Sequence, residues 1–460
     1  MAFKMSAAKI FKSRFGSRYL TKIYLEKIKS SGAIGIDRVR PSSLDKTLSA
    51  EIKLILTKVK NGSYRFTPYK EKLISKGCSS FPRQISIPTA RDRIVLRALC
   101  DCLSQVFPDT KLKLPQVVIH SLKEALSSHH YEEYAKIDLQ KFYPSISHEL
   151  INSSIRGKIR KPQFLQLIRD AVSTPTVPEA KGGKNASRNL HGVPQGLAIS
   201  NVLAEIALHS VDLQIQKIPN IWFKRYVDDI LILTPKGQSE DVANLVVDKL
   251  KSINLSPHPV GEPDSKSKVA CLSESFVFLG YQVGLNGISI RQESIHRFEA
   301  SLAKIFTAYR HRLNVVRTPQ DKERAIAYCE WELNLRITGC IFEGRRLGWI
   351  SYFSQISSTV QLRSINHTVR KLVSRFNLER SISPKSLIKT FYELQRGDKA
   401  THKYIPNYDE LTIVQQRQIL AISLGAALVN KMSSAEVERK FKYKISKAVR
   451  DLEKDISHIS

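Results

Sequence analysis

The chain has 460 residues, of which 42% are hydrophobic, so it is long enough for two or three domains that each bury a core. Its 73 Lys and Arg residues outnumber 42 Asp and Glu residues, and the net charge of +31 favours nucleic acid as the partner. This surplus is not a basic tail. Residues 291–460 carry 30 basic and 17 acidic residues, or +13, which leaves +18 for residues 1–290.

The apolar segments and the cysteines argue against membrane, secreted and zinc-binding proteins. The longest apolar stretch, Ile419 to Val429, is too short to cross a bilayer, and the basic N-terminus is not followed by the apolar segment of a signal peptide. The six cysteines form no C-x-x-C pair, which indicates neither a zinc site nor a disulfide framework. We therefore expect a cytoplasmic protein without membrane contact.

The first 134 residues combine helical and strand-like patterns. Residues 17–60 have the spacing of helices. Short strands are predicted at Tyr64 to Pro68, Lys72 to Ile74 and Arg83 to Pro88, where polar and apolar residues alternate. Helical spacing returns from Asp92 to Val106.

Residues 135–290 are richer in strand patterns. One strand is predicted to end at Asp138, and a long apolar helix at Leu197 to Leu213. Two hairpins follow, one over Trp222 to Leu233 and one formed by Phe276 to Val283 with Gly287 to Ile290.

Helical spacing dominates from Gln292 to the end, with breaks near Pro319, Pro384 and Pro406. We expect a mostly helical domain over residues 291–460, without strands. A helical-repeat array in this part stays open.

The tetrapeptide Tyr226-Val227-Asp228-Asp229 lies between two apolar runs that predict a hairpin. Two adjacent carboxylates repel each other, and a divalent cation between them would relieve that repulsion. A Val-Asp-Asp-Ile string also fits a solvated turn, because Asp favours turns. Other motifs of the sequence are needed to choose between a metal site and a solvated turn.

A nucleotidyl transferase that uses two metal ions needs carboxylates from separate elements, because the ions stand about 3.5 to 4 Å apart. Asp138 follows an apolar strand and is the candidate for the third acid, although an Asp at a strand end also serves as a helix cap. Between these acids lies Gly192-Val193-Pro194-Gln195-Gly196, a string that brings backbone close to a ligand before a helix, or simply joins a loop to a helix.

Six segments in order then carry a resemblance. They are Arg83 to Pro88 with Asp92-Arg93, Asp138 to Ile146, Gly192 to Asn201, Tyr226 to Asp229, Lys266, and Phe278 to Tyr281. This order resembles the fingers and palm motifs of reverse transcriptases, and it covers about Tyr19 to Ile290.

The resemblance is finer at two segments. Phe142-Tyr143-Pro144-Ser145-Ile146 and Gly196-Leu197-Ala198-Ile199-Ser200-Asn201 are similar to the abortive-infection and "unknown group" defence reverse transcriptases of bacteria. Group II intron enzymes resemble the chain less well, and the string typical of retron enzymes is not evident.

The resemblance implies catalytic and metal-binding residues. Asp138 and Asp228 would bind two Mg²⁺ ions, with Mn²⁺ as an alternative, and Asp229 beside them would set the charge of the site. Lys266 would protonate the leaving pyrophosphate, with Lys268 as a rival two residues away.

The resemblance also implies nucleotide-binding residues. Tyr143 would stand under the sugar and exclude a ribose 2′-hydroxyl, which predicts deoxynucleotides as substrates. Gln195 would contact the incoming nucleotide, and Arg83 would clamp its phosphates. The remaining candidates for nucleotide binding are Leu139, Phe142 and Arg93. Arg91 is a further rival for the phosphates. Phe278 to Tyr281 would grip the primer.

The implied fold is an α+β right-hand polymerase. Its expected domains are fingers with N-terminal helices over 1–134, a palm over 135–290, and a mostly α-helical thumb or extension over 291–460. The helical domain would hold nucleic acid, while contact with a partner protein or another copy of the chain stays open.

The implied function is RNA-directed DNA synthesis from a noncoding RNA template, in bacterial antiviral defence, with RNA, dNTPs and DNA as partners. Three alternatives stay open. They are a template-independent or protein-primed polymerase of abortive-infection type, a retron-like or group II intron-type reverse transcriptase, and a non-catalytic RNA-binding scaffold. The intact Asp138, Asp228 and Asp229 argue against the scaffold.

Overall fold

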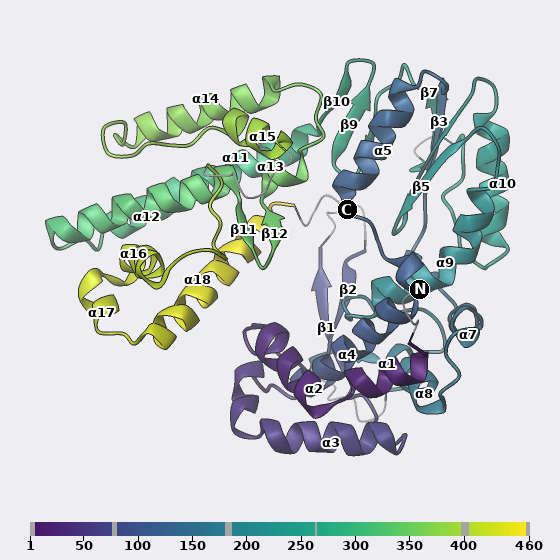
Figure 1. Ribbon diagram of the computed structural model, residues 1–460. Helices are drawn as coiled ribbons and strands as arrows, with labels where there is room; N and C mark the ends of the chain where they lie inside the picture. Colours follow the sequence, from purple (N-terminus) through teal and green to yellow (C-terminus); the bar gives the residue numbers. More distant parts are fainter. Residues whose placement is uncertain (1–4, 76–80, 180–185, 263–264, 397–403, 457–460) are drawn as a thin grey trace. The chain divides into compact units, whose positions relative to one another are not determined.

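The computed structural model describes residues 5–75, 81–179, 186–262, 265–396 and 404–456 (Figure 1). Contacts between residues divide the chain into two compact units, and each is described by itself. The first unit contains residues 1–113 and 129–271, and the second contains residues 114–128 and 272–460.

The first unit is built from helices around two small sheets. Its helical elements are α1 (Ala7–Arg14), α2 (Ser17–Ile23), the π-helical turn η1 (Tyr24–Ile28), the 3₁₀ helices η2 (Pro41–Lys46) and η3 (Pro108–Thr110), α3 (Leu48–Lys60), α4 (Ala90–Val106), α6 (Phe142–Ser145), α7 (His148–Arg156), α8 (Pro162–Ser173), α9 (Ser200–Ile215) and α10 (Ser239–Lys251). A three-stranded sheet has the order β2-β1-β4, with β1 at Tyr69–Ile74, β2 at Arg83–Ile87 and β4 at Thr176–Val177.

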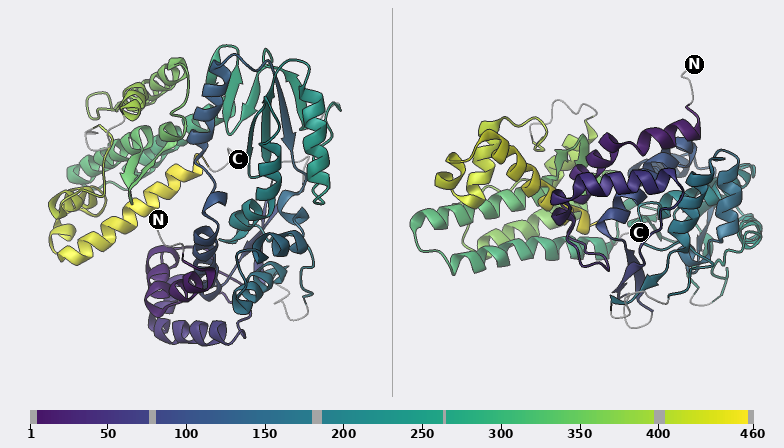
Figure 2. Two further views of the ribbon diagram at one scale, coloured as in Figure 1. Left: turned by 45° about the vertical axis from the view of Figure 1, so that its right-hand side comes forward. Right: turned by 90° about the horizontal axis from the view of Figure 1, so that it is seen from below.

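The second sheet of this unit is antiparallel and has the order β5-β6-β3-β7. Its strands are β3 (Glu133–Asp138), β5 (Trp222–Tyr226), β6 (Asp229–Thr234) and β7 (Lys268–Cys271). The run Ile230–Leu233 is fully buried, as expected for a central strand covered on both faces. Helix α10 contacts β3, β6 and β7 and so covers one face of the sheet (Figure 2).

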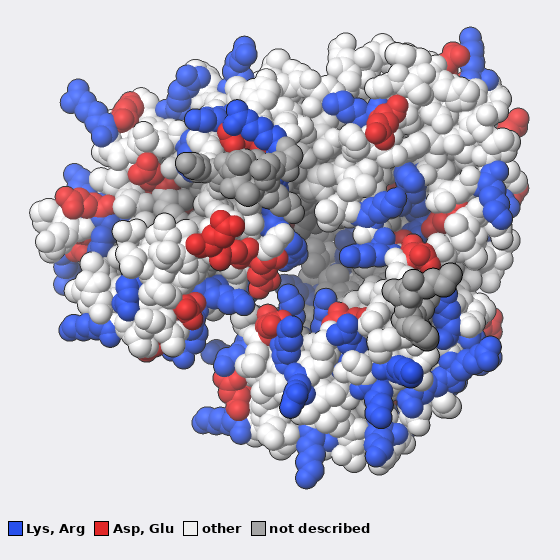
Figure 3. All heavy atoms as spheres, in the orientation of Figure 1, with Lys and Arg blue, Asp and Glu red and all other residues white. Residues whose placement is uncertain are grey.

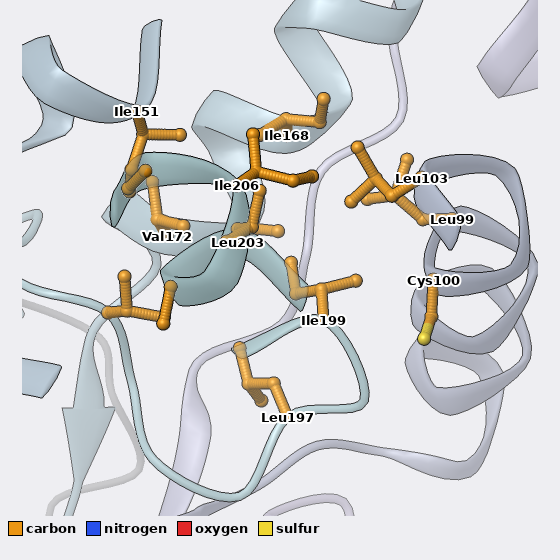
Figure 4. Packing of buried hydrophobic residues seen from close by; sticks show 14 of the residues in the cluster. Leu99, Cys100, Leu103, Ile151, Ile168, Val172, Leu197, Ile199, Leu203 and Ile206 are labelled. Carbon is orange, nitrogen blue, oxygen red and sulfur yellow. The ribbon is translucent and has the colours of Figure 1, made fainter. Parts of the chain in front are cut away.

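Helix α9 lies within the main core of the first unit. Its residues Leu203, Ala204 and Ala207 are fully buried, and Leu203 and Ile206 lie among apolar side chains of α4, α7 and α8 (Figure 4). Each fully buried Leu or Ile side chain contributes about 1.5 to 3 kcal/mol, so this packing fixes α9 firmly.

The second unit is mostly helical. Its helices are α5 (Pro115–Ser127), α11 (Gln292–Leu313), α12 (Pro319–Thr338), α13 (Trp349–Tyr352), α14 (Val360–Arg375), α15 (Leu387–Gln395), α16 (Ile413–Leu424), α17 (Ala426–Asn430) and α18 (Ser434–Lys454). It also contains the meander β8 (Phe276–Phe278), β9 (Tyr281–Gly284) and β10 (Gly287–Ile290), and the hairpin β11 (Cys340–Phe342) and β12 (Arg345–Leu347).

The contact-based units do not follow the predicted domain boundaries. Residues 114–128, expected in the fingers, and residues 272–290, expected in the palm, group with the helical unit. The division into fingers, palm and thumb at residues 134 and 290 stays a prediction.

The strand predictions were wrong at two turns. Phe276 to Val283 is not one strand, because Leu279 and Gly280 have φ values of 49° and 77° and turn the chain between β8 and β9. Residues 291–460 are not free of strands, because Glu343 and Gly344 have φ values of 51° and 69° and join β11 to β12. Two consecutive positive φ values form a tight hairpin turn, and Leu and Glu are not residues that signal it.

The predicted strand at Tyr64 to Pro68 is also wrong, since Tyr64 to Thr67 have no strand pairing. This segment is held by Asp92, which is 1% exposed. The Asp92 carboxylate accepts hydrogen bonds from the Tyr64 hydroxyl at 2.6 Å and from the Thr67 N–H at 3.1 Å. A buried acid on α4 thus takes the place of a strand partner.

Two observations concern membrane-spanning helices and cysteines within the described residues. No helix in the described ranges is long and apolar enough to cross a membrane. The five described cysteines, Cys100, Cys102, Cys271, Cys329 and Cys340, are free, and Cys78 lies outside the described residues.

Candidate active site

The three predicted acids lie at one end of the four-stranded sheet. Asp138 at the end of β3 is paired in register with Asp229 at the start of β6. Tyr226 at the end of β5 pairs with Asp229 at the start of β6, so the loop between these strands has two residues, Val227 and Asp228. Antiparallel pairing therefore brings together acids that are about 90 residues apart in the sequence.

Basic side chains face two of these carboxylates. The Lys136 ammonium lies 3.3 Å from Oδ1 of Asp229. His258 Nε2 lies 3.3 Å from Oδ2 of Asp138, and the exposed Lys266 ammonium lies 4.0 Å from the same oxygen. The two lysine ammonium groups thus offset part of the repulsion within the cluster.

Burial of Asp229 makes its charge costly. Burial raises the pKa of Asp229 from 3.8 to about 6; Lys136 opposes this change, while the carboxylates of Asp138 and Asp228 add to it. Oδ1 of Asp229 is a buried atom that makes no well-formed hydrogen bond with a described residue. The Lys136 ammonium, 3.3 Å from this oxygen, already faces it, and a metal ion bound by Asp229 would compete with that ammonium.

The donor chemistry fits Mg²⁺, since all three predicted ligands offer hard carboxylate oxygens. Among the described residues, however, no three His, Cys, Asp or Glu side chains are arranged to hold an ion. The acids lie beside the basic side chains of Lys136, Lys266 and His258 instead, so a bound ion would have to displace these side chains.

Tyr143, the predicted sugar gate, lies near the same acids. Its hydroxyl donates a hydrogen bond to Oδ1 of Asn201 in α9. Burial raises the pKa of Tyr143 to about 12, the charges of Asp228 and Glu205 add to this, and Arg83 opposes it. The pKa of Tyr143 thus depends on the charges of both Asp228 and Arg83, two of the other predicted site residues.

The glycines of the predicted platform are required by close backbone contacts. Gly192 has a φ of +82°, and a Cβ added there would lie 2.8 Å from the carbonyl oxygen of Pro144. Gly196 has a φ of +97°, and its Cβ would lie 2.8 Å from Cγ2 of Ile85. Both the left-handed backbone and the lack of space exclude a side chain.

Gln195 lies between these glycines and connects the platform to strand β2. Its carbonyl oxygen accepts a hydrogen bond from the Ser86 N–H at 2.7 Å. The side chain of Gln195 is partly exposed, so the backbone of this residue is fixed while its amide remains accessible.

The three candidate arginines differ in what they contact. Arg83 is exposed at the start of β2. Arg93 is partly buried and donates hydrogen bonds to the carbonyl oxygen of Pro88 at 3.1 Å and to Oγ of Ser31 at 3.0 Å. Arg91 forms an ion pair with Glu51. Arg83 therefore has the most accessible guanidinium of the three.

The remaining predicted residues lie in two places. Leu139 and Phe142 are buried, at 4% exposure each, so their side chains belong to the core of the first unit. Phe278 and Tyr281 are fully buried within the second unit, where the Tyr281 hydroxyl donates to the carbonyl oxygen of Tyr352. Lys268, the rival of Lys266, begins β7 opposite Lys136.

Two residues beside the acids were missed from the sequence. His258 belongs to a segment that pairs with the residues after β3, since the His258 N–H donates to the carbonyl oxygen of Asp138 at 2.8 Å. Arg225 precedes the tetrapeptide predicted to be catalytic, and its guanidinium contacts Glu205, Asp212 and the Val227 carbonyl. The position of His258 depends on long-range pairing and could not be predicted from the sequence. Arg225 could have been noticed, because Glu205 and Asp212 are two acids seven residues apart on the apolar helix α9.

Comparison with known proteins shows to which family part of the chain is similar. Residues 70–283 match the family described as reverse transcriptase (RNA-dependent DNA polymerase). The chain carries a reverse transcriptase domain. All the site residues described above lie within the matched range. With the mostly helical residues 291–460, the match confirms the α+β right-hand polymerase fold expected from the sequence.

Several curated proteins are similar to this chain. Protein YkfC of Escherichia coli is 21% identical over 334 residues, which cover 60% of this chain and 85% of YkfC. An uncharacterized 91 kDa protein in a cob intron of Schizosaccharomyces pombe is 25% identical over 44% of this chain and 25% of its own length. The group II intron-encoded protein LtrA of Lactococcus lactis is 27% identical over 35% of this chain.

The chain spans about a quarter of two of these relatives, 25% of the Schizosaccharomyces pombe protein and 28% of LtrA. Among solved structures, telomerase from Candida albicans in complex with a fragment of telomeric RNA has a TM-score of 0.43 and 15% identity, covering 85% of this chain and 63% of the telomerase chain.

Proposed function

We propose that this protein is an RNA-directed DNA polymerase whose reverse transcriptase domain is catalytically active. The observation that carries the proposal is the pairing of Asp138 with Asp229 in register, beside Asp228 in the hairpin loop. Three acids are kept together at the price of mutual repulsion and a raised Asp229 pKa. Such an arrangement is costly for a scaffold and useful for binding metal ions.

We assign Asp138, Asp228 and Asp229 to two Mg²⁺ ions, which would supply activation of the primer hydroxyl and charge stabilisation of the triphosphate. The Lys266 ammonium, 4.0 Å from Oδ2 of Asp138, would give a proton to the leaving pyrophosphate. Tyr143 would reject a ribose 2′-hydroxyl, and the exposed Arg83 would bind the phosphates of a dNTP.

The charge of the chain supports nucleic acid as the partner. Lys and Arg side chains are spread over the face shown in Figure 3, and Asp and Glu side chains are fewer there. The net charge of +31 is shared by residues 1–290 and 291–460, so we propose that both parts of the chain contact an RNA template or the DNA product. Contact of residues 291–460 with a second copy or a partner protein is the competing proposal.

We propose antiviral defence as the biological role, with a noncoding RNA as the template. The support is the resemblance of Phe142 to Ile146 and of Gly196 to Asn201 to defence reverse transcriptases. A role with a mobile intron is the second candidate, favoured by the similarity to intron-encoded proteins such as LtrA. Nucleic acid that copurifies with the protein, made with its native flanking DNA, would identify the template.

The activity is tested by primer extension on an RNA template with the double variant Asp228→Asn/Asp229→Asn. We expect no extension product, because the amides bind Mg²⁺ weakly. A matched control is Asp241→Asn/Asp248→Asn, which removes the same charge from exposed positions of α10 and should keep the activity. Extension by the first variant would refute the metal assignment.

The sequence of the product separates the remaining alternatives. A product complementary to the RNA supports templated synthesis, and a random or homopolymeric product that is insensitive to RNA supports an untemplated or protein-primed polymerase. RNA binding without any product from the wild-type protein would support a non-catalytic scaffold.

A further inference from the structure

Arg225 is a buried arginine directly before the catalytic tetrapeptide. Its side chain is 2% exposed, and it lies on β5 one residue before Tyr226. Arginine is rarely buried so completely unless its donors are paired, so the contacts of this guanidinium indicate why it is buried.

Two acids of α9 hold the guanidinium. Nη1 and Nη2 of Arg225 donate to the two carboxylate oxygens of Glu205 at 2.9 and 2.8 Å. Nε and Nη2 donate to Asp212 at 2.9 and 2.6 Å. The pKa of Glu205 is raised by burial, and Arg225 opposes this change. Glu205 and Asp212 are seven residues apart, so they lie on one face of the helix.

The same guanidinium also reaches the catalytic loop. Nη1 of Arg225 donates to the carbonyl oxygen of Val227 at 2.9 Å. That carbonyl belongs to the peptide bond that joins Val227 to Asp228, so the contact acts directly on the backbone that carries the acid. A charged donor to a backbone carbonyl is stronger than a neutral one.

The backbone at Val227 is strained. Val227 has a φ of +59°, and the two-residue loop has a positive φ at its first residue only. Loops of this type favour glycine at that position, and a β-branched residue there is a genuine outlier. Such a conformation persists only when its surroundings hold it in place.

We propose that Arg225 is a positioning residue, fixed on α9 by Glu205 and Asp212, which holds the Val227 carbonyl and thereby sets the placement of Asp228 and Asp229. The inference rests on the proposed polymerase function of this site. Helix α9 suits this role because it is fixed in the core by residues such as Leu203 and Ile206 (Figure 4). A buried network of ion pairs contributes little to the stability of a fold. The contact between this network and the loop is therefore a better explanation for the network than stability is.

The first test is Arg225→Lys. Lysine keeps one positive charge between the two carboxylates, but its compact ammonium cannot bind both carboxylates and the carbonyl in one plane. We expect kcat for primer extension to fall about 10- to 100-fold, which corresponds to one lost charge-assisted hydrogen bond. The KM for dNTP should stay within about twofold, because nucleotide-binding residues are untouched.

The decisive test is the double variant Arg225→Lys/Val227→Gly. Glycine adopts a positive φ without strain, so it removes the need for the contact with the carbonyl. We expect this variant to regain most of the lost kcat. An arginine that only stabilises the fold would show no such rescue, since Val227→Gly restores none of its ion pairs.

A second readout does not depend on turnover. Binding of Mn²⁺ to the wild-type protein and to both variants is followed by electron paramagnetic resonance, and Arg225→Lys should weaken it while the double variant restores it. The control is Arg336→Lys, which alters a largely buried ion pair with Asp455, the residue directly after α18, and should keep both kcat and Mn²⁺ affinity. If Arg225→Lys does not fold, Arg225→Met/Glu205→Met/Asp212→Leu replaces the network with apolar packing and is assayed in the same way.

Unchanged kcat and Mn²⁺ affinity in a folded Arg225→Lys, or failure of Val227→Gly to rescue it, would overturn the inference and leave the proposed polymerase intact. A wild-type protein that neither extends a primer nor binds Mn²⁺ would overturn both.

Discussion

Removal of the charge of Asp229 should stabilise the metal-free protein while it abolishes activity. Burial raises the pKa of this carboxyl from 3.8 to about 6 in the folded state. At 1.36 kcal/mol per pKa unit, the charged form costs at most about 3 kcal/mol of folding free energy. The variant Asp229→Asn avoids this cost, because the amide is neutral at every pH.

The effect depends on pH in a defined direction. Because the folded-state pKa of Asp229 lies above its unfolded value, its contribution is favourable below pH 3.8 and is lost as the pH rises through about 6. The advantage of Asp229→Asn should therefore be complete at pH 8, about half as large at pH 5, and absent below pH 3.8.

Thermal unfolding in EDTA at several pH values measures this effect. The midpoint temperature is preferred to a free energy, because a chain with two units need not unfold in one step. About 2 °C per kcal/mol predicts a rise of up to about 6 °C at pH 8. Mg²⁺ should raise the midpoint of the wild-type protein and close the gap, since it binds the folded state.

The exposed Asp248→Asn serves as the control and should show no such rise. The reasoning fails if Asp229→Asn melts at or below the wild-type temperature at pH 8, or if the difference stays constant between pH 8 and pH 5.

Three further predictions concern the platform, the gate and the proton donor. Gly196→Ala should lower stability by about 1 to 3 kcal/mol and reduce extension, whereas Gly237→Ala, also at positive φ but with nothing within 4 Å, should cost less; equal losses would contradict the steric argument. Tyr143→Ala should raise the use of rNTPs relative to dNTPs, and Asn201→Ala should do so more weakly because it frees the Tyr143 hydroxyl; unchanged rNTP discrimination in both variants would refute the gate. Lys266→Met should lower kcat about 100-fold with little change in KM, and a kcat close to wild type would remove Lys266 from the mechanism.

The three acids could be proposed from the sequence because Asp138 follows a strand-like segment and Asp228-Asp229 lies between two others. The motifs implied that Asp138 and Asp229 belong to one site, but they did not predict that β3 pairs with β6 or that these two acids are in register. His258 was missed for the same reason: its position is set by pairing with residues more than 100 positions earlier.

The fold was predictable where the patterns were long and was missed where they were short. The apolar runs of β6 and α9 indicated their buried positions correctly. The strands β11 and β12 have three residues each, too few to show alternation, and they turn at Glu343-Gly344 without the usual Asn or Asp before the glycine. A turn made by an unexpected residue leaves no signature in composition.

The arrangement around α9 has a consequence for how related chains vary. Replacement of any one residue of the buried network leaves a charge without its partner, which is strongly unfavourable. The network consists of Glu205, Asp212 and Arg225. We expect these three positions to change together among homologues. Where the arginine is missing, both acids should be missing too, and the first residue of the hairpin loop should then be small. An alignment of homologues would show whether these positions vary together, without any purified enzyme.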